Sequence, residues 1–97
     1  MQIGIDVGAT KIESVVLDEK GNESNRERTD CPKDYFQIVK TIKEIDKKLE
    51  KKFNKELPIG VCHPGVHSPQ TGLVKNAPNC YWLEKKPFQN DLRKELG

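Results

Sequence analysis

Hydrophobic and polar residues alternate at the start of the chain, which predicts a β-strand because successive side chains of a strand point to opposite faces. The apolar positions are Ile3, Ile5 and Val7, and they alternate with Gln2, Gly4 and Asp6. A tight turn at 8–11 follows, and residues 12–17 predict a second strand with an apolar end. A third strand is expected at 23–29, after the turn at 20–22. It has no apolar side chain, which an edge strand tolerates.

A long amphipathic helix is predicted after the third strand. Asp34 is placed to cap it, and Gln37, three residues later, completes a capping-box-like pair. Apolar residues then recur every three or four positions, with Lys and Glu mostly on the other side, as in a helix that packs one face against a core. The apolar stripe consists of Tyr35, Ile38, Val39, Ile42, Ile45, Leu49 and Phe53.

The second half of the chain contains shorter elements. Pro58 ends any continuation of the helix, and residues 59–62 are predicted to form a short buried strand. Residues 63–88 are punctuated by Pro and Gly and predict loops, and residues 89–96 can begin another helix. Three hairpin-linked strands, a helix and one more strand predict an α/β domain. Its mixed sheet would have strands one to three antiparallel and the long helix packed on one face.

Composition limits the classes of protein to which the chain can belong. Its 97 residues form one small domain at most, and a net charge of +2 is too small to indicate nucleic-acid binding. No apolar run approaches the roughly 20 residues of a membrane span, and the first residues lack the features of a signal peptide. Three cysteines without CxxC spacing argue against a disulfide framework or a zinc site. We therefore expect a cytoplasmic domain with no nucleic-acid or membrane partner.

The first motif with chemical meaning is Asp6-x-Gly8-x-Thr10-Lys11, at the end of the first strand and in the turn after it. Gly8 and Ala9 are small enough to let backbone N–H groups approach a phosphate, while Thr10 adds a hydroxyl donor and Lys11 a positive charge. Asp6 would repel a phosphate, but it can hold Mg²⁺ or a magnesium-bound water. The alternative is a plain hairpin turn, and the position on the first strand favours the phosphate site.

A second candidate site lies at 64–79. The turn at Pro64-Gly65 lets backbone groups come close to a ligand. Asn76 and Asn79 carry amides that donate and accept hydrogen bonds at once, as a sugar requires. Alternatively, one or both of these residues only stabilise turns.

Taken together, the two motifs resemble those of the ROK sugar kinases, which belong to the actin-like, ribonuclease H-like ATPase superfamily. Residues 3–12 are similar to the opening phosphate motif of that family. Its sugar-side loop resembles Pro64-Gly65 followed by Ser68-Pro69-x-Thr71-Gly72-x-Val74-Lys75-Asn76-Ala77, and the likeness continues to Trp82-Leu83. This form of the loop looks closest to the bacterial fructokinase (manno(fructo)kinase) branch, with the N-acetylglucosamine kinases next. The resemblance spans essentially the whole chain.

The resemblance implies that the chain is the N-terminal lobe, residues 1–97, of a two-lobe ATP-dependent hexose kinase that acts on fructose or mannose first. It assigns ATP phosphate and Mg²⁺ binding to Asp6, Gly8, Ala9, Thr10 and Lys11, and sugar binding to Pro64, Gly65, Asn76 and Asn79. The family's general base is an Asp in an Asn-Asp-Ala-Asn-like segment. We expect that Asp and the C-terminal lobe beyond Gly97, and therefore no catalytic residue within the 97. A homodimer of the complete protein is compatible with the resemblance.

The sequence departs from the family pattern at several positions. Ala9 stands where the family usually has a second Gly, and Cys62-His63 stands where its members more often carry a small or aliphatic pair. His63 and His67 do not share a helix face, so we do not expect a metal site there. Trp82 is expected to anchor the core rather than to stack on a sugar.

Two other hypotheses stay open. A ROK transcriptional repressor shares this lobe for sensing sugar, but such repressors carry a helix-turn-helix segment before the first strand, whereas Met1 here sits directly on that strand. An isolated binding module of the actin-like superfamily would fit a protein that ended at Gly97. Under the kinase hypothesis, the 97 residues alone are expected to release no ADP in response to a sugar.

Overall fold

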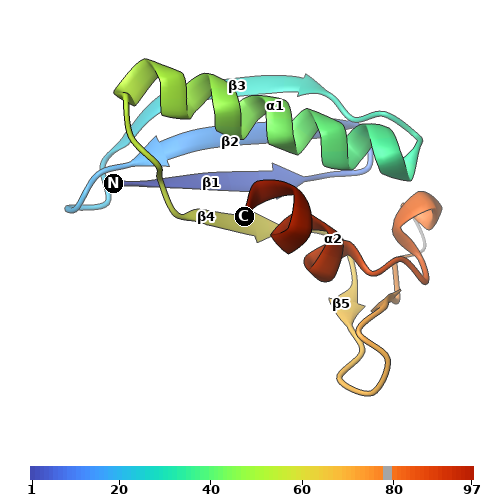
Figure 1. Cartoon of the computed structure of the whole chain (residues 1–97). Helices are drawn as coiled ribbons and strands as arrows, with labels where there is room; N and C mark the ends of the chain where they lie inside the picture. The colour runs from blue at the N-terminus through green and yellow to red at the C-terminus, as the bar shows by residue number, and fades with distance from the viewer. Residues whose placement is uncertain (78–79) are drawn as a thin grey trace.

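The computed structural model describes residues 1–77 and 80–97 and shows a four-stranded mixed sheet with both of its α-helices on one face (Figure 1). The strand order is β3-β2-β1-β4. β1 (Gln2–Val7), β2 (Lys11–Leu17) and β3 (Glu23–Asp30) are antiparallel neighbours, and β4 (Ile59–Cys62) lies parallel to β1. The predicted mixed sheet is confirmed, and β2 and β3 each extend one residue beyond the predicted bounds.

The long predicted helix is α1 (Tyr35–Phe53), which connects β3 to β4 across one face of the sheet. The carboxylate of Asp34 caps it by accepting the Gln37 N–H at 3.2 Å, and Asn54 ends it in the left-handed conformation with a φ of 55°. The reciprocal bond of a capping box, from the Gln37 side chain, is not among the hydrogen bonds of the described residues. The stop at Asn54 comes before Pro58, so a left-handed cap ends the helix.

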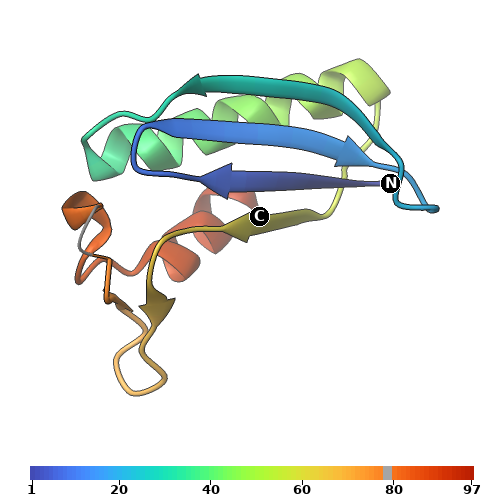
Figure 2. The ribbon, with the colours of Figure 1, turned by 180° about the vertical axis from the view of Figure 1, so that it is seen from behind.

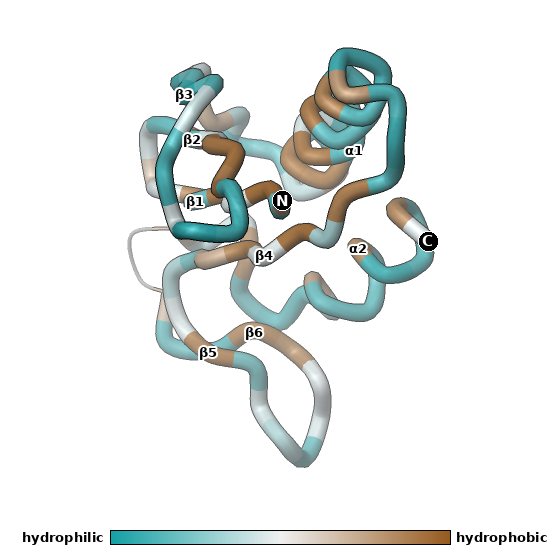
Figure 3. The backbone as a smooth tube through the Cα atoms, turned by 90° about the vertical axis from the view of Figure 1, so that its left-hand side faces the viewer, coloured by the Kyte–Doolittle hydropathy of each residue, from teal (hydrophilic) through white to brown (hydrophobic). Residues whose placement is uncertain are grey.

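The hydrophobic core lies between the sheet and α1. The sheet contributes Ile3, Ile5, Val7, Ile12 and Val16, each at most 3% exposed, and α1 contributes chiefly Ile38 and Ile42. Figure 3 shows the same arrangement as hydrophobic segments of β1, β2 and α1 that face one another. The alternation in β1 and the three-to-four spacing in α1 therefore meet as two complementary apolar faces.

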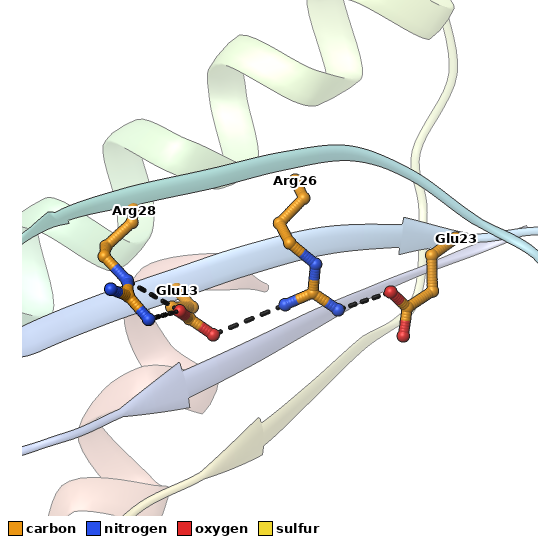
Figure 4. A network of polar contacts seen from close by, with 4 residues as sticks. All are labelled: Glu13, Glu23, Arg26 and Arg28. Atoms are coloured by element: carbon orange, nitrogen blue, oxygen red, sulfur yellow. Dashed lines mark hydrogen bonds and ion pairs between the residues drawn. The ribbon is translucent and has the colours of Figure 1, made fainter.

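The polar strand β3 is held by ion pairs and by its ladder of hydrogen bonds to β2. Glu13 of β2 accepts from Arg28 at 2.7 Å and from Arg26 at 3.3 Å, and Arg26 also pairs with Glu23 (Figure 4). These contacts lie on the face of the sheet that no helix covers within residues 1–77 and 80–97 (Figure 2). Because exposed ion pairs contribute little each, the backbone pairing carries most of the stability of this edge.

The prediction that β4 is a buried strand is wrong. Gly60 and Cys62 are exposed, and Ile59 and Val61 are only half-buried. β4 is exposed because it is the last strand in the order, so one of its edges has no neighbouring strand in the described part of the chain. A short apolar run therefore predicted the strand correctly but not its burial.

The predicted loop region contains a two-stranded hairpin, β5 (Val66–His67) with β6 (Val74–Lys75), and a 3-10 turn at Tyr81–Leu83. The chain then forms α2 (Phe88–Leu96), which confirms the last predicted helix and begins one residue earlier. The Tyr35 hydroxyl donates to Asp91 at 2.5 Å and so ties α2 to α1. No helix among the described residues is long and apolar enough to span a bilayer.

One buried charge lies in the middle of α1. Asp46 is 2% exposed, and its Oδ1 atom has no hydrogen-bond partner within the residues that the structure describes. Burial raises the pKa of this carboxyl above its ordinary value of 3.8, and the negative charges of Glu50 and Glu56 raise it further, against the opposite effect of Lys47. A carboxylate in such a place destabilises the folded state because desolvation disfavours its charge.

We therefore expect Asp46→Asn to increase the free energy of unfolding at pH 7, on the order of 1 kcal/mol. A raised folded pKa means that the folded protein binds more protons than the unfolded chain in the window just above pH 3.8. The wild type thus loses stability as the pH rises through that window, and the advantage of the variant should vanish below it. Chemical denaturation at pH 3.5 and pH 7 measures the difference, with exposed Glu44→Gln as the control. Equal effects at both pH values would contradict the assignment.

Candidate functional site

The two motifs leave the sheet from neighbouring strands. β1 and β4 are parallel and in register, with Asp6 opposite Cys62, so both strands end at the same edge. The turn that follows β1 and the Pro64-Gly65 segment that follows β4 therefore start close together. Ligands of open α/β sheets commonly bind at this place, outside the carboxyl ends of parallel strands.

The turn after β1 is closed by short backbone contacts. The Gly8 N–H donates to the Lys11 carbonyl at 2.8 Å, and the Cys31 N–H donates to the Thr10 carbonyl at 2.9 Å. A Cβ atom on Gly8 would lie 3.0 Å from the Lys11 carbonyl oxygen, so a side chain there would be tightly packed and glycine fits the turn best. The N–H groups of Ala9 and Thr10 donate to no backbone carbonyl in the described part of the chain. Two adjacent free amides in a tight turn are suited to an anion.

The charged side chains of this motif have different surroundings. Asp6 is exposed at the end of β1 and forms no ion pair with any described residue. Lys11, in contrast, pairs with the exposed carboxylate of Asp30 on β3 and holds the pKa of that carboxyl below its usual value. A phosphate at the turn would thus compete with Asp30 for the Lys11 ammonium group. A carboxylate oxygen, a hydroxyl and free amides fit a Mg²⁺-bound phosphate chain, because Mg²⁺ prefers hard oxygen ligands.

The second motif is assembled around Gly65. Its φ is 75°, and a Cβ atom there would lie 2.3 Å from the Lys75 carbonyl oxygen and 3.2 Å from the Ala77 Cβ. Gly65 therefore packs directly on the backbone that carries Asn76, so two of the predicted sugar-binding residues are brought together. Asn76 itself is exposed and left-handed, with a φ of 61°. Its amide group forms no hydrogen bond among the described residues.

The sequence also makes predictions for Pro64, Asn79 and Trp82. Pro64 precedes Gly65 in the same turn and is half-buried. Asn79, the fourth predicted sugar-binding residue, lies outside the described residues together with Pro78. Trp82 is 8% exposed and belongs to the core, as expected.

Sequence reasoning missed Glu84. Its carboxylate accepts the N–H of Ala77, the residue after Asn76, from the far end of the same loop. A glutamate after Trp-Leu carries no periodicity or motif that predicts such a contact. The bond depends on how the loop folds back on itself, which only the structure shows.

The two histidines interact with each other and with backbone groups. The His63 Nδ1 atom lies 2.8 Å from the Pro64 carbonyl, and the His67 Nε2 atom accepts the Gln89 N–H at 3.0 Å, near the start of α2. Their ring centroids are 4.7 Å apart. Burial lowers the pKa of His67, and the nearby His63 lowers it further, so His67 remains neutral and keeps its acceptor atom for Gln89. No cluster of three or more candidate metal ligands occurs among the described residues.

A groove of about 560 Å³ lies beside the open edge of β4. It is bordered by α1, β4 and α2 and includes the buried Asp46, together with Val61, His67 and Leu92. Neither the turn after β1 nor Asn76 lines it. The groove is therefore separate from the place where the two motifs meet.

Comparison with known proteins gives a consistent result. A model of the ROK family matches residues 2–97. The N-acetyl-D-glucosamine kinase of Haemophilus influenzae is 35% identical over 98 residues, covering 100% of this chain and 32% of the relative. The enzyme of the same name from Vibrio atlanticus is 36% identical over 100 residues, with the same coverage. A ROK family glucokinase from Streptomyces griseus, solved with glucose and AMPPNP, matches with a TM-score of 0.80 at 25% identity, covering 99% of this chain and 30% of that one.

These matches also limit what the chain shows. It spans about a third of the length of the curated relatives that it matches. The shared fold confirms the predicted α/β architecture of the actin-like kinases. The predicted likeness to the fructokinase branch is not supported, because these curated relatives are N-acetylglucosamine kinases.

The packing of Gly65 against the Asn76 backbone can be tested with a matched pair of glycines. Gly65 and Gly72 have similar positive φ values, 75° and 73°, but the nearest atom to an added Cβ is 2.3 Å away at Gly65 and 3.7 Å away at Gly72. We expect Gly72→Ala to lower the free energy of unfolding by about 1 kcal/mol through backbone strain alone. Gly65→Ala should cost roughly 1–3 kcal/mol more because the 75–77 backbone must move. Urea denaturation measures both, and equal losses would show that the two segments do not touch.

Proposed function

Because this chain belongs to the ROK family, we propose that the complete protein is a sugar kinase that transfers a phosphoryl group from ATP to a sugar hydroxyl. The observation that carries the proposal is the parallel register of β1 with β4. It places two segments at one edge of the sheet: the turn after β1, whose amides are free among the described residues, and the loop after β4, which carries the Asn76 amide. A phosphate donor and a hydroxyl acceptor must meet in line for transfer, and this arrangement supports that meeting.

In this proposal the turn after β1 binds the phosphate chain. The amides of Ala9 and Thr10 would donate to phosphate oxygens, and the Thr10 hydroxyl would add a third donor. Asp6 would hold Mg²⁺ directly or through water, and the ion would neutralise charge on the phosphates. Lys11 would exchange its contact with Asp30 for one with a phosphate, since both partners are exposed and their pairing is weak.

The Gly65–Asn76 contact supports a sugar site beside that turn. The amide of Asn76 would donate to and accept from ring hydroxyls, and Gly65, which has no side chain, lets the backbone that carries Asn76 pack against it. Pro64 and Asn79 belong to the same proposed site. The general base is assigned to an Asp beyond Gly97, as the resemblance to the family implies, so the chemical step needs the complete protein.

N-Acetyl-D-glucosamine is the proposed acceptor, because the curated relatives are kinases of that sugar. The acetyl methyl group needs apolar surface, and Val66, next to Gly65, is 53% exposed and could supply it. Fructose and mannose are the competing acceptors, because they are the first expectation from the loop sequence between Ser68 and Ala77. Both hypotheses place the sugar against Asn76.

The acceptor is tested by kcat/KM of the complete protein with ATP and Mg²⁺ on N-acetylglucosamine, glucose, mannose and fructose. We expect N-acetylglucosamine to give the highest value. A site built to hydrogen-bond particular hydroxyl and amide groups disfavours a sugar that cannot form those bonds. The expected loss in kcat/KM is roughly 10²–10⁵-fold, which corresponds to several kcal/mol at most. A clear preference for fructose or mannose would overturn the acceptor, and no phosphorylation of any sugar would overturn the kinase itself.

Because one motif is proposed to bind phosphate and the other to bind sugar, variants of the two should have different kinetic effects. Asp6→Asn and Thr10→Val should lower kcat by about 10²–10³, because they remove contacts to charge that develops in the transition state. Asn76→Ala should instead raise the KM for the sugar about tenfold and leave the KM for ATP nearly unchanged. Exposed Glu19→Gln is the control. The assignment fails if the Asp6 and Thr10 variants keep a normal kcat, or if Asn76→Ala affects ATP rather than sugar.

A further inference from the structure

The loop from Val74 to Lys86 is closed at its base by two backbone hydrogen bonds. The Val74 N–H donates to the Lys86 carbonyl at 3.0 Å, and the Lys85 N–H donates to the Val74 carbonyl at 2.7 Å. Lys85 reaches this position in a left-handed conformation, with a φ of 60°. The segment that carries Asn76 is thus held at both ends by a frame that is independent of any ligand.

Inside this frame the peptide between Asn76 and Ala77 is fixed by a charged side chain. The Glu84 carboxylate accepts the Ala77 N–H, and the Ala77 carbonyl accepts the Cys80 N–H at 3.1 Å. Ala77 is fully buried, while Glu84 is half-buried. A hydrogen bond to a carboxylate is about twice as strong as one between neutral groups, so this contact helps to fix the orientation of the peptide.

The orientation of that peptide, together with the backbone before it, sets the direction of the Cα–Cβ bond from which the Asn76 amide extends. The Ala77 N–H belongs to the peptide whose orientation is related to Asn76 by ψ, and Asn76 occupies the left-handed region, which Asn enters more readily than most residues. Gly65 packs against the Lys75 and Asn76 backbone at the same place. Asn76 is therefore held between Gly65 and the bond from Glu84 to Ala77, with its own amide exposed.

We propose that Glu84 is a positioning residue for the sugar site: it fixes the Asn76–Ala77 peptide and thereby aims the Asn76 amide at the sugar, without touching the sugar itself. This inference rests on the proposed function and extends it, since neither motif in the sequence includes Glu84. It predicts a specific pattern of kinetic effects. Removing the carboxylate should act on sugar recognition alone, and only while Asn76 is present.

The experiment uses the complete protein with Glu84→Ala, Glu84→Gln, Asn76→Ala and the double variant Glu84→Ala/Asn76→Ala. Glu84→Ala should raise the sugar KM about tenfold, with the ATP KM unchanged within about twofold. Glu84→Gln should restore most of the loss, because its side-chain oxygen still accepts the Ala77 N–H. In the Asn76→Ala background, Glu84→Ala should add less than about twofold, because residues that act through one group are not additive.

A purely structural role would give a different pattern. Additive effects in the double variant, equal changes in the sugar and ATP KM values, or an unchanged sugar KM in Glu84→Ala would each overturn the proposal. Exposed Glu44→Ala is the matched control for loss of a glutamate.

Hydrogen exchange at the Ala77 amide keeps this test separate from that of the kinase function. Glu84→Ala should speed this exchange at least about tenfold, since opening of a protected amide follows the free energy of its bond, and Glu84→Gln should slow it again. The change in exchange rate is expected even if the protein phosphorylates no sugar. That result would overturn the proposed function but not the contact between Glu84 and Ala77. Unchanged exchange in Glu84→Ala would overturn the positioning role.

Discussion

The parallel pairing of β1 with β4 is the constraint on which the rest of the structure depends. It runs from Ile3 opposite Ile59 to Asp6 opposite Cys62, and the Ile3 N–H extends it by donating to the Pro58 carbonyl at 2.8 Å. A parallel pair needs a long connection, and the chain makes it through β2, β3 and α1, which covers the apolar face of the sheet. Because both strands run the same way, both motifs begin at one edge. A register shift of one residue would move the two motifs apart and reverse the faces of β4.

The loops at this edge take their shape from backbone contacts more than from apolar burial. A Cβ atom would collide with a carbonyl oxygen at Gly65, at 2.3 Å, and would be tightly packed against one at Gly8, at 3.0 Å. Asn76 holds a left-handed conformation between Gly65 and the peptide that Glu84 fixes. Such contacts leave little freedom in the loop, which is what a site must have if its hydrogen bonds are to favour one sugar over another. The same loop conformations leave the backbone amides of Ala9 and Thr10 and the side-chain amide of Asn76 open to ligands.

Local patterns predicted most of the fold, because each pattern reports a face that the structure buries. Alternation identified β1, the apolar end of residues 12–17 identified β2, and the three-to-four spacing identified α1. The same reasoning misjudged β4, whose apolar residues predicted burial although the strand lies at the edge of the described sheet. The candidate site was found by motif at Asp6–Lys11 and at Gly65 and Asn76. The contacts of Glu84 with Ala77, His67 with Gln89 and Lys11 with Asp30 join residues 7 to 22 positions apart, and no sequence period encodes them.

In the proposed function, the carboxyl ends of β1 and β4 bring a phosphate donor and a sugar together. This arrangement is tested most directly by a crystal structure of the complete protein with Mg²⁺, a non-hydrolysable ATP analogue and N-acetylglucosamine, the proposed acceptor. We expect phosphate oxygens within hydrogen-bond distance of the Ala9 or Thr10 amides, and a sugar hydroxyl within hydrogen-bond distance of the Asn76 side chain. Binding of either ligand away from this edge, for example in the groove beside β4 that includes Asp46, would contradict it.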